Sequence, residues 1–106
     1  MSKEQMQGHQ NQDEIFSYAQ ILVEGVVEKH GEIDDQIETF SQGWSLDRMP
    51  ALDKAILRVA LWEILFNDEV PDPVAIDEAV EIAKEYSTDD SGSFINGLLA
   101  RISSTK

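Results

Sequence analysis

Apolar residues recur at three- and four-residue steps along most of this chain, which is the period of an amphipathic helix. A first helix is predicted over residues 13–30, where the step is kept by Phe16, Ala19, Val23, Val26 and Val27. A shorter second helix keeps it through Ile33, Ile37 and Phe40. We expect His30-Gly31 to separate the two helices, because glycine can take the left-handed conformation that ends a helix. Gly43 is expected to close the second.

The stretch from Ala51 to Phe66 is apolar on so many sides that it predicts a buried central helix. Pro50 fixes a backbone angle at its entry, and the connector before it offers apolar anchors at Trp44, Leu46 and Met49. Burying one large aliphatic side chain contributes roughly 1.5 to 3 kcal/mol, while a domain has a net stability of only about 5 to 15 kcal/mol. This segment can therefore decide whether the domain folds.

Two further helices are predicted after the Pro71-Asp72-Pro73 turn. The inward stripe of the first comprises Val74, Ile76, Ala79, Val80, Ile82 and Ala83. The second follows the capping residues Thr88, Asp89 and Asp90, and its apolar face comprises Phe94, Ile95, Leu98, Leu99 and Ile102. Asn96-Gly97 lacks the strand-like flanks of a hairpin and is assigned to this helix, with Gly97 permitting close packing. The predicted fold is all-α, a compact bundle of about five helices around a buried central helix.

Length and composition favour one domain that binds partners of the opposite charge. The 106 residues have room for a single core, placed at residues 13–102 between a flexible tail over 1–12 and a short tail over 103–106. Lys and Arg number 8 against 21 Asp and Glu, so the net charge of -13 repels a phosphate backbone and suits a basic or neutral partner surface. The absence of cysteine excludes disulfides, and no apolar run approaches the roughly 20 residues that span a membrane. These features predict a cytoplasmic protein without a membrane partner.

Residues that could carry out catalysis or hold a metal are few. His9 and His30 have no second histidine at metal-site spacing, so a structural or solvated role is expected for each. The acidic runs at Asp34-Asp35-Glu38 and Glu78-Glu81-Glu85 have no phosphate-holding neighbours and read as solvated helix faces. The STDDSGS segment misses the ligand positions of a calcium loop at both ends, which favours helix capping. We predict no cofactor, no metal site and no enzymatic activity.

One local group of basic residues could contact phosphate: Arg48, Lys54 and Arg58. Lys54 and Arg58 are one helical turn apart, and Arg48 lies just upstream. The group lies among acidic residues, so the alternative is a solvated face or pairing with carboxylates of the same chain.

Three blocks of the chain resemble a known family: LDRMPALDKAILRVALWEIL, VPDPVAIDEAVEIAKEYS and DDSGSFINGLLARI. Their order and spacing are similar to those of the NusB family of bacterial transcription antitermination factors, and the likeness extends more weakly back to about Ile15. The resemblance implies a non-enzymatic helical adaptor that helps transcription of ribosomal RNA operons resist termination. Its partners would be NusE, a small-subunit ribosomal protein, and the boxA segment of the nascent RNA.

The same resemblance implies three partner-binding residues. Asp53 in LDKAILR matches an acidic position at the NusE contact, and Asp90 in DDS and Phe94 in SFING match positions at or beside the NusE and RNA surface. Each residue also has a structural interpretation. Asp53 and Asp90 lie near helix starts, where a negative charge suits the helix dipole, and Phe94 could belong to the core.

The chain departs from the family pattern at its start. Family members usually open with an arginine-rich helix that contacts RNA, whereas this chain opens MSKEQMQGHQNQDE, with one lysine and no arginine, so boxA binding is expected to be weakened. The face that the usual first helices cover is expected to be apolar and exposed on the helix over residues 13–30. We expect it to mediate association with a second copy or another chain. Two alternative functions stay open: an accessory domain of a ribosomal RNA cytosine methyltransferase, and a structural helical dimer without an RNA role.

Overall fold

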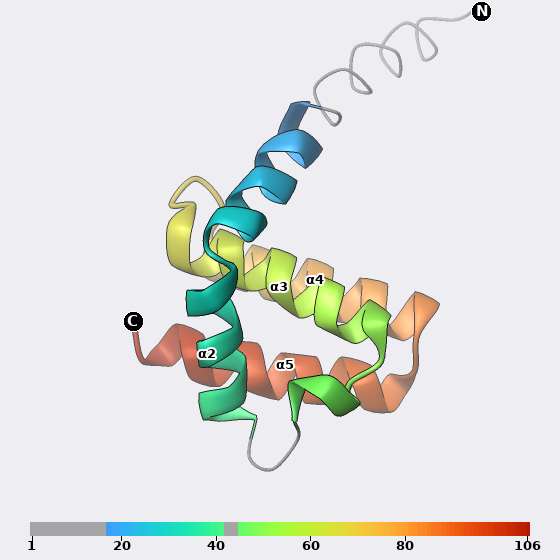
Figure 1. Ribbon diagram of the computed structural model, residues 1–106. Coiled ribbons are helices and arrows are strands. Elements are labelled where there is room, and N and C mark those ends of the chain that lie inside the picture. The colour runs from blue at the N-terminus through green and yellow to red at the C-terminus, as the bar shows by residue number, and fades with distance from the viewer. Residues whose placement is uncertain (1–16, 42–44) are drawn as a thin grey trace, which may run out of the picture.

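The computed structural model describes residues 17–41 and 45–106, which form helices joined by short turns and contain no strand (Figure 1). The first described helix covers residues 17–28 and turns at Lys29. The elements that follow are α2 (His30–Phe40), the 3-10 helix η1 (Leu46–Arg48), α3 (Ala51–Phe66), α4 (Asp72–Tyr86) and α5 (Asp89–Ser104). The predicted all-α fold is confirmed. The predicted tail over residues 1–12 and the connector residues Gly43 and Trp44 lie outside the described residues.

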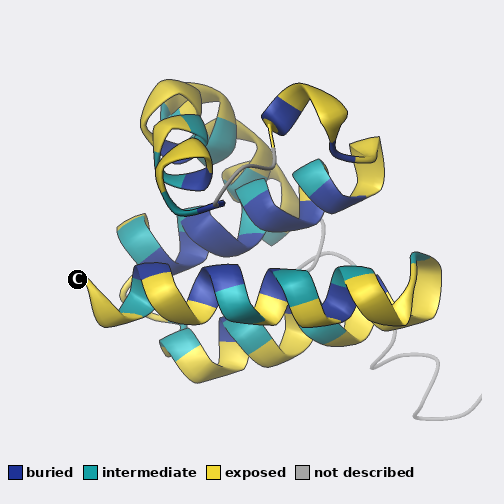
Figure 2. Ribbon diagram, turned by 90° about the horizontal axis from the view of Figure 1, so that it is seen from below, coloured by how far each residue is buried: buried dark blue, intermediate teal, exposed yellow. Residues whose placement is uncertain are grey.

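Helix α3 lies at the centre of the bundle, where it packs against α2, α4 and α5. Helix α5 is equally central, since it packs against α2, α3 and α4. Figure 2 shows that buried positions gather where the helices face one another. The large side chains buried there are Ile33, Ile37, Leu57, Leu61, Ile64, Ile95, Leu98, Leu99 and Ile102. The first helix lies at the edge of the bundle (Figure 1), where Tyr18 and Gly25 contact α3.

The apolar residues of α3 are not all buried. Leu57 and Leu61 are completely buried, whereas Leu52, near the start of the helix, is 40% exposed, and Phe66, at its last position, is also exposed. Ala55 and Val59 in the middle of the helix are exposed and half-buried, respectively. The helix therefore leaves an apolar surface on the side that faces the first helix.

The inward face of α4 differs from the predicted one. Its buried residues are Ala75, Ala79 and Ala83, which recur at four-residue steps, while Val74 and Ile82 are each 44% exposed. Residues four apart form a ridge along a helix, and small side chains on that ridge allow a close approach between helices. The predicted inward positions of Ala79 and Ala83 are confirmed, whereas those of Val74 and Ile82 are wrong.

The predicted break between the first two helices lies at Lys29, one residue before His30-Gly31, and Gly31 does not take the expected left-handed conformation. The backbone amide of Lys29 donates to the carbonyl of Gly25 and that of Ile33 donates to the carbonyl of Lys29, both at 3.0 Å, so helical hydrogen bonding continues through the junction. Helix α2 begins at His30, and Gly31 lies inside it without a left-handed backbone. The chain changes direction at Lys29 instead.

Glycine allows close packing at Gly25, not at the predicted Gly97. A Cβ atom at Gly97 would meet nothing within 4 Å, whereas one at Gly25 would overlap the indole of Trp62. Gly25 thus lets the first helix lie directly against Trp62 of α3. The assignment of Asn96-Gly97 to a helix is confirmed.

Most of the predicted anchors and caps are confirmed. Leu46 and Met49 are buried, and Pro50 directly precedes α3. Thr88 caps α5, because its hydroxyl accepts a hydrogen bond from the amide of Ser91 at 2.9 Å. Helix α5 ends at Ser104, two residues after residue 102, which is the predicted end of the domain.

Candidate partner-binding surface

Asp53 lies at the start of α3 and is buried, with 4% of its surface exposed. Its Oδ2 accepts a hydrogen bond from the Ser91 hydroxyl at 2.8 Å. Its Oδ1 is buried and has no hydrogen-bond partner among the described residues. The carboxylate therefore joins the start of α3 to the first turn of α5, and it also suits the positive end of the α3 dipole.

Hydroxyl groups between α4 and α5 extend this junction. Ser87, which follows α4, donates from its hydroxyl to the Ser91 hydroxyl at 3.1 Å, and the Thr88 hydroxyl lies 3.0 Å from the same oxygen. Ser91 in turn donates to Asp53. Capping preferences in STDDSGS predicted the role of Thr88, but no sequence signal placed Asp53 beside Ser91.

Asp90 and Phe94 lie on the same part of α5, since residues four apart share a helix face. Asp90 is exposed in the first turn. Phe94 is half-buried and packs against the edge of the core. Asp53 is thus joined to the first turn of α5, which contains Asp90; Asp90 is exposed, whereas Asp53 is buried.

The predicted basic group is divided between different environments. Arg58 makes two hydrogen bonds to Asp34 of α2, from Nε to Oδ1 at 3.0 Å and from Nη2 to Oδ2 at 3.1 Å. His30 Nε2 lies 2.9 Å from the same carboxylate. Arg58 therefore fastens α3 to α2, which favours the intramolecular interpretation for this residue. Arg48 is exposed on η1, and Lys54 is half-buried on α3.

A polar cluster that sequence reasoning missed joins the first helix to α3. The Tyr18 hydroxyl donates to Glu63 Oε2 at 2.8 Å and accepts from Asn67 Nδ2 at 3.1 Å. Burial raises the pKa of Glu63, the hydrogen bond from Tyr18 lowers it in part, and the charge of Glu78 raises it further. Burial and the neighbouring Glu63 raise the pKa of Tyr18 to about 12. The available signal was Glu63 itself, the acid that stands among apolar residues in VALWEILF.

The sequence of this chain matches the family model described as the NusB family over residues 1–104. The chain belongs to the NusB family. It is 62% identical over 89 residues to the transcription antitermination protein NusB of Leifsonia xyli subsp. xyli. The aligned segment covers 84% of this chain and 62% of that protein. It is also 59% identical over 85 residues to the protein of the same name from Beutenbergia cavernae, and this aligned segment covers 80% of this chain and 56% of that protein.

A solved structure of T. maritima NusB shares the fold of this NusB-family chain. The TM-score is 0.79 at 43% sequence identity, and the match covers 83% of this chain and 62% of that one. This chain therefore spans about three fifths of the length of the NusB proteins that it matches. At 43% identity, the two proteins are related in sequence as well as in fold.

Two features are absent from residues 17–41 and 45–106 of this NusB-family chain. No three His, Cys, Asp or Glu side chains in these ranges are grouped so that they could hold a metal ion. In the same ranges, no helix has the length and apolar character needed to cross a membrane.

Proposed function

We propose that this chain is a non-enzymatic adaptor in transcription antitermination, which holds NusE and, together with it, the boxA RNA of ribosomal RNA operons. The observation that carries the proposal is family membership, with 62% identity over 84% of the chain to a protein named for transcription antitermination. NusE and boxA come from the resemblance to the NusB family. The net charge of -13 supports a basic protein partner, because complementary charge speeds encounter and disfavours wrong partners.

The proposed NusE contact is the start of α5. Asp90 is exposed there and Phe94 is half-buried beside it, so both can reach a partner. Asp53 acts as a positioning residue, because its bond to Ser91 holds the first turn of α5 against α3. Because Asp53 is buried, it can offer a partner little contact area of its own.

RNA would bind through the complex more than through this chain alone. Nonspecific RNA affinity comes mainly from Lys and Arg that displace counterions, and the chain carries 8 of these against 21 acids. Arg58 is already paired with Asp34, which leaves Arg48 and Lys54 as the cations of the basic group that could meet phosphate. We therefore expect weak binding of boxA RNA without NusE and tighter binding with it.

Mixing the purified chain with NusE and labelled boxA RNA, at about 0.15 M salt where screening is physiological, tests the proposal. The Asp90→Lys variant should weaken NusE binding about tenfold, because it places a positive charge against a basic partner and like charges across an interface are unfavourable. The matched control is Asp77→Lys on α4, which makes the same charge change at an exposed position away from the start of α5. It should alter binding by less than about twofold. If the unaltered chain binds neither NusE nor RNA, the adaptor proposal is wrong and a structural role is left.

A further inference from the structure

A cleft of about 630 Å³ lies between α2, the end of α3 and the end of α5. Its apolar wall includes Phe40 of α2, Leu65 of α3 and Ile102 of α5. This volume is within the range of about 300–1,000 Å³ that is typical of ligand sites. Along α5, Ile102 is about 18 Å from Asp90, so the cleft is separate from the proposed NusE contact.

The rim of the cleft offers mainly hydrogen-bond acceptors. Glu32 and Asp35 of α2 contribute two exposed carboxylates. The hydroxyl of Thr39 donates to the carbonyl of Asp35 at 2.7 Å, and that of Thr105 donates to the carbonyl of Ile102 at 2.8 Å. Because each hydroxyl carries a single proton, both oxygens are left as acceptors. A ligand that fits this rim must therefore bring several donors of its own.

The charge of the rim favours a cation. Glu32 lies 3.9 Å from Lys29, whereas Asp35 forms no ion pair with any Lys or Arg of residues 17–41 and 45–106. Helices α3 and α5 both end beside the cleft, and the carbonyl end of a helix carries a partial negative charge. A positive group placed between Glu32 and Asp35 would thus be stabilised by both carboxylates and both helix ends.

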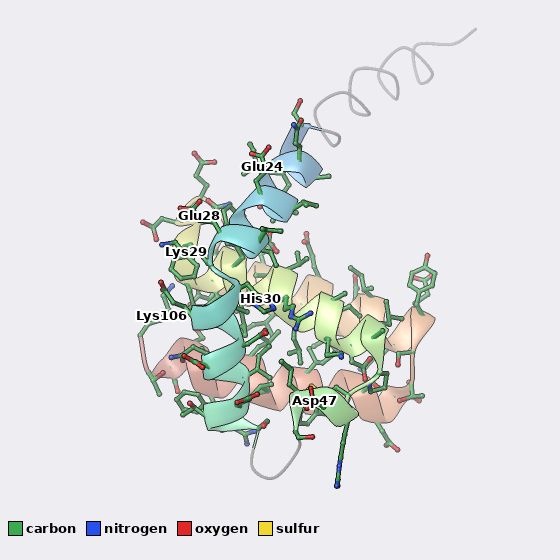
Figure 3. All side chains as sticks on the ribbon, viewed as in Figure 1. Glu24, Glu28, Lys29, His30, Asp47 and Lys106 are labelled. Atoms are coloured by element: carbon green, nitrogen blue, oxygen red, sulfur yellow. The ribbon has the colours of Figure 1, made fainter. Side chains whose placement is uncertain are left out.

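Two lysines of the chain already bind at this end of the bundle. The Lys29 ammonium lies over the Phe66 ring, 5.2 Å from its centroid, in a cation–π contact. The Lys106 ammonium donates to the carbonyl of Ile64 and to the carboxylate of Asp72. Figure 3 shows both lysines at the edge of the molecule where α3 ends. Both ammonium groups have partners elsewhere, so neither occupies the position beside Asp35.

We propose that this cleft binds an arginine side chain from a basic segment of another protein, with the guanidinium between Glu32 and Asp35 and the aliphatic stem on Phe40 and Leu65. Residues three apart share a helix face, so the two carboxylates can meet one guanidinium. Its five N–H donors form a planar fork that suits carboxylates and aromatic rings better than an ammonium does. The net charge of -13 attracts a basic segment and disfavours a second copy of this chain. The proposal goes beyond the proposed function, because it uses neither Asp90 nor Phe94.

The test uses the full chain, isotopically labelled for NMR, and a short unstructured peptide with one arginine and with both ends capped. Titration should give saturable shifts of the amides in α2, at Leu65 and Phe66 and over residues 102–106, with no shift at Asp90. The same peptide with lysine in place of arginine has the same charge and should bind at least about fivefold more weakly. Equal affinity of the two peptides would overturn the proposal, because charge alone would then account for binding.

Variants of α2 separate the cleft from general acidity. Asp35→Asn should weaken the arginine peptide about tenfold, because it removes one of the two carboxylates that meet the guanidinium. Glu38→Gln is the matched control, since it removes one charge at an exposed position of the same helix outside the cleft. It should change the affinity by less than about twofold, and equal losses in the two variants would overturn the proposal. Thermal unfolding of both variants should match that of the unaltered chain.

Two further measurements test the competing occupants. Free arginine should bind at least about tenfold more weakly than the peptide, because its own carboxylate would lie near Asp35, and equal affinity would assign the cleft to a small molecule and overturn the proposal. Sedimentation equilibrium without peptide should show no dimer that Asp35→Asn dissociates, since such a dimer would assign the cleft to a second copy. NusE binding separates this proposal from the proposed function: Asp35→Asn should leave it intact, and Asp90→Lys should leave peptide binding intact.

Discussion

Replacing Gly25 by alanine tests how the first helix is attached to the bundle. A Cβ atom at this position would lie 2.7 Å from Trp62 Cζ2 and closer still to Nε1 and Cε2 of the same ring. Overpacking of this kind costs typically 1–3 kcal/mol, here about 2 kcal/mol, whereas alanine in a helix interior gains roughly 0.5–1 kcal/mol over glycine. The overlap is the larger effect, so we expect Gly25→Ala to destabilise the chain by about 1 kcal/mol. In a domain of this size that lowers the melting temperature by roughly 4–8 °C.

Gly97→Ala is the control, because a Cβ atom there meets nothing within 4 Å. It should stabilise the chain by about 0.5–1 kcal/mol, the usual gain within a helix. Thermal unfolding followed by circular dichroism measures both variants. Fluorescence in a Trp44→Phe background, which leaves Trp62 as the single tryptophan of the chain, reports whether the indole is displaced into water. If Gly25→Ala raises the melting temperature as much as Gly97→Ala does, the close contact with Trp62 does not limit this position and the reasoning fails.

Three further changes have defined outcomes. Leu57→Ala should lower the free energy of unfolding, measured in urea, by about 3 kcal/mol, because Leu57 is completely buried. Leu52→Ala, which alters an exposed leucine of the same helix, should lower it by less than about 1 kcal/mol. Similar losses in the two variants would contradict the burial described for α3. Glu63→Gln should raise the melting temperature at neutral pH. Because the folded-state pKa of Glu63 is raised, the unaltered chain loses stability as the pH rises from the ordinary carboxyl value of about 4.3 through that pKa. The difference in melting temperature between the variant and the unaltered chain should therefore vanish below about pH 4. Asp72→Asn should lower the melting temperature at pH 7, because the hydrogen bond from Ser103 stabilises the charged carboxylate and lowers the Asp72 pKa. The difference in melting temperature between the variant and the unaltered chain should disappear as the pH falls below about 3.9 and through the folded-state pKa.

The helices could be predicted from local sequence because their period and their ends are local properties. Pro50 precedes α3, and Thr88 caps α5 through a bond to an amide only three residues away. The orientation of each helix was harder to predict, because it depends on what the neighbouring helix offers. In α4 the alanine ridge at Ala75, Ala79 and Ala83 faces inward, although Val74 and Ile82 are more hydrophobic.

The polar contacts that shape the candidate sites could not be predicted, since each joins residues distant in sequence. Arg58 is bound by Asp34, which precedes it by 24 residues, and Glu63 is bound by Tyr18, which precedes it by 45. Nothing in the spacing of either pair marks them as partners. Family resemblance could point to Asp53, Asp90 and Phe94, but it could not tell which of them is exposed.

The burial of Asp53 decides how its part in binding can be tested. A lysine in its place would remove the bond that joins α3 to α5 and bury an unpaired positive charge beside Ser91, which is strongly unfavourable. Loss of NusE binding in Asp53→Lys would then follow from an altered α5 start even if Asp53 never touched the partner. Asp53→Asn keeps an oxygen that can accept from Ser91, so it removes the charge while preserving the junction. If Asp53 acts only by position, Asp53→Asn should bind NusE within about twofold of the unaltered chain, whereas Ser91→Ala, which breaks the same junction from the other side, should weaken binding more. A tenfold loss in Asp53→Asn with an unchanged melting temperature would instead make the charge itself part of the contact.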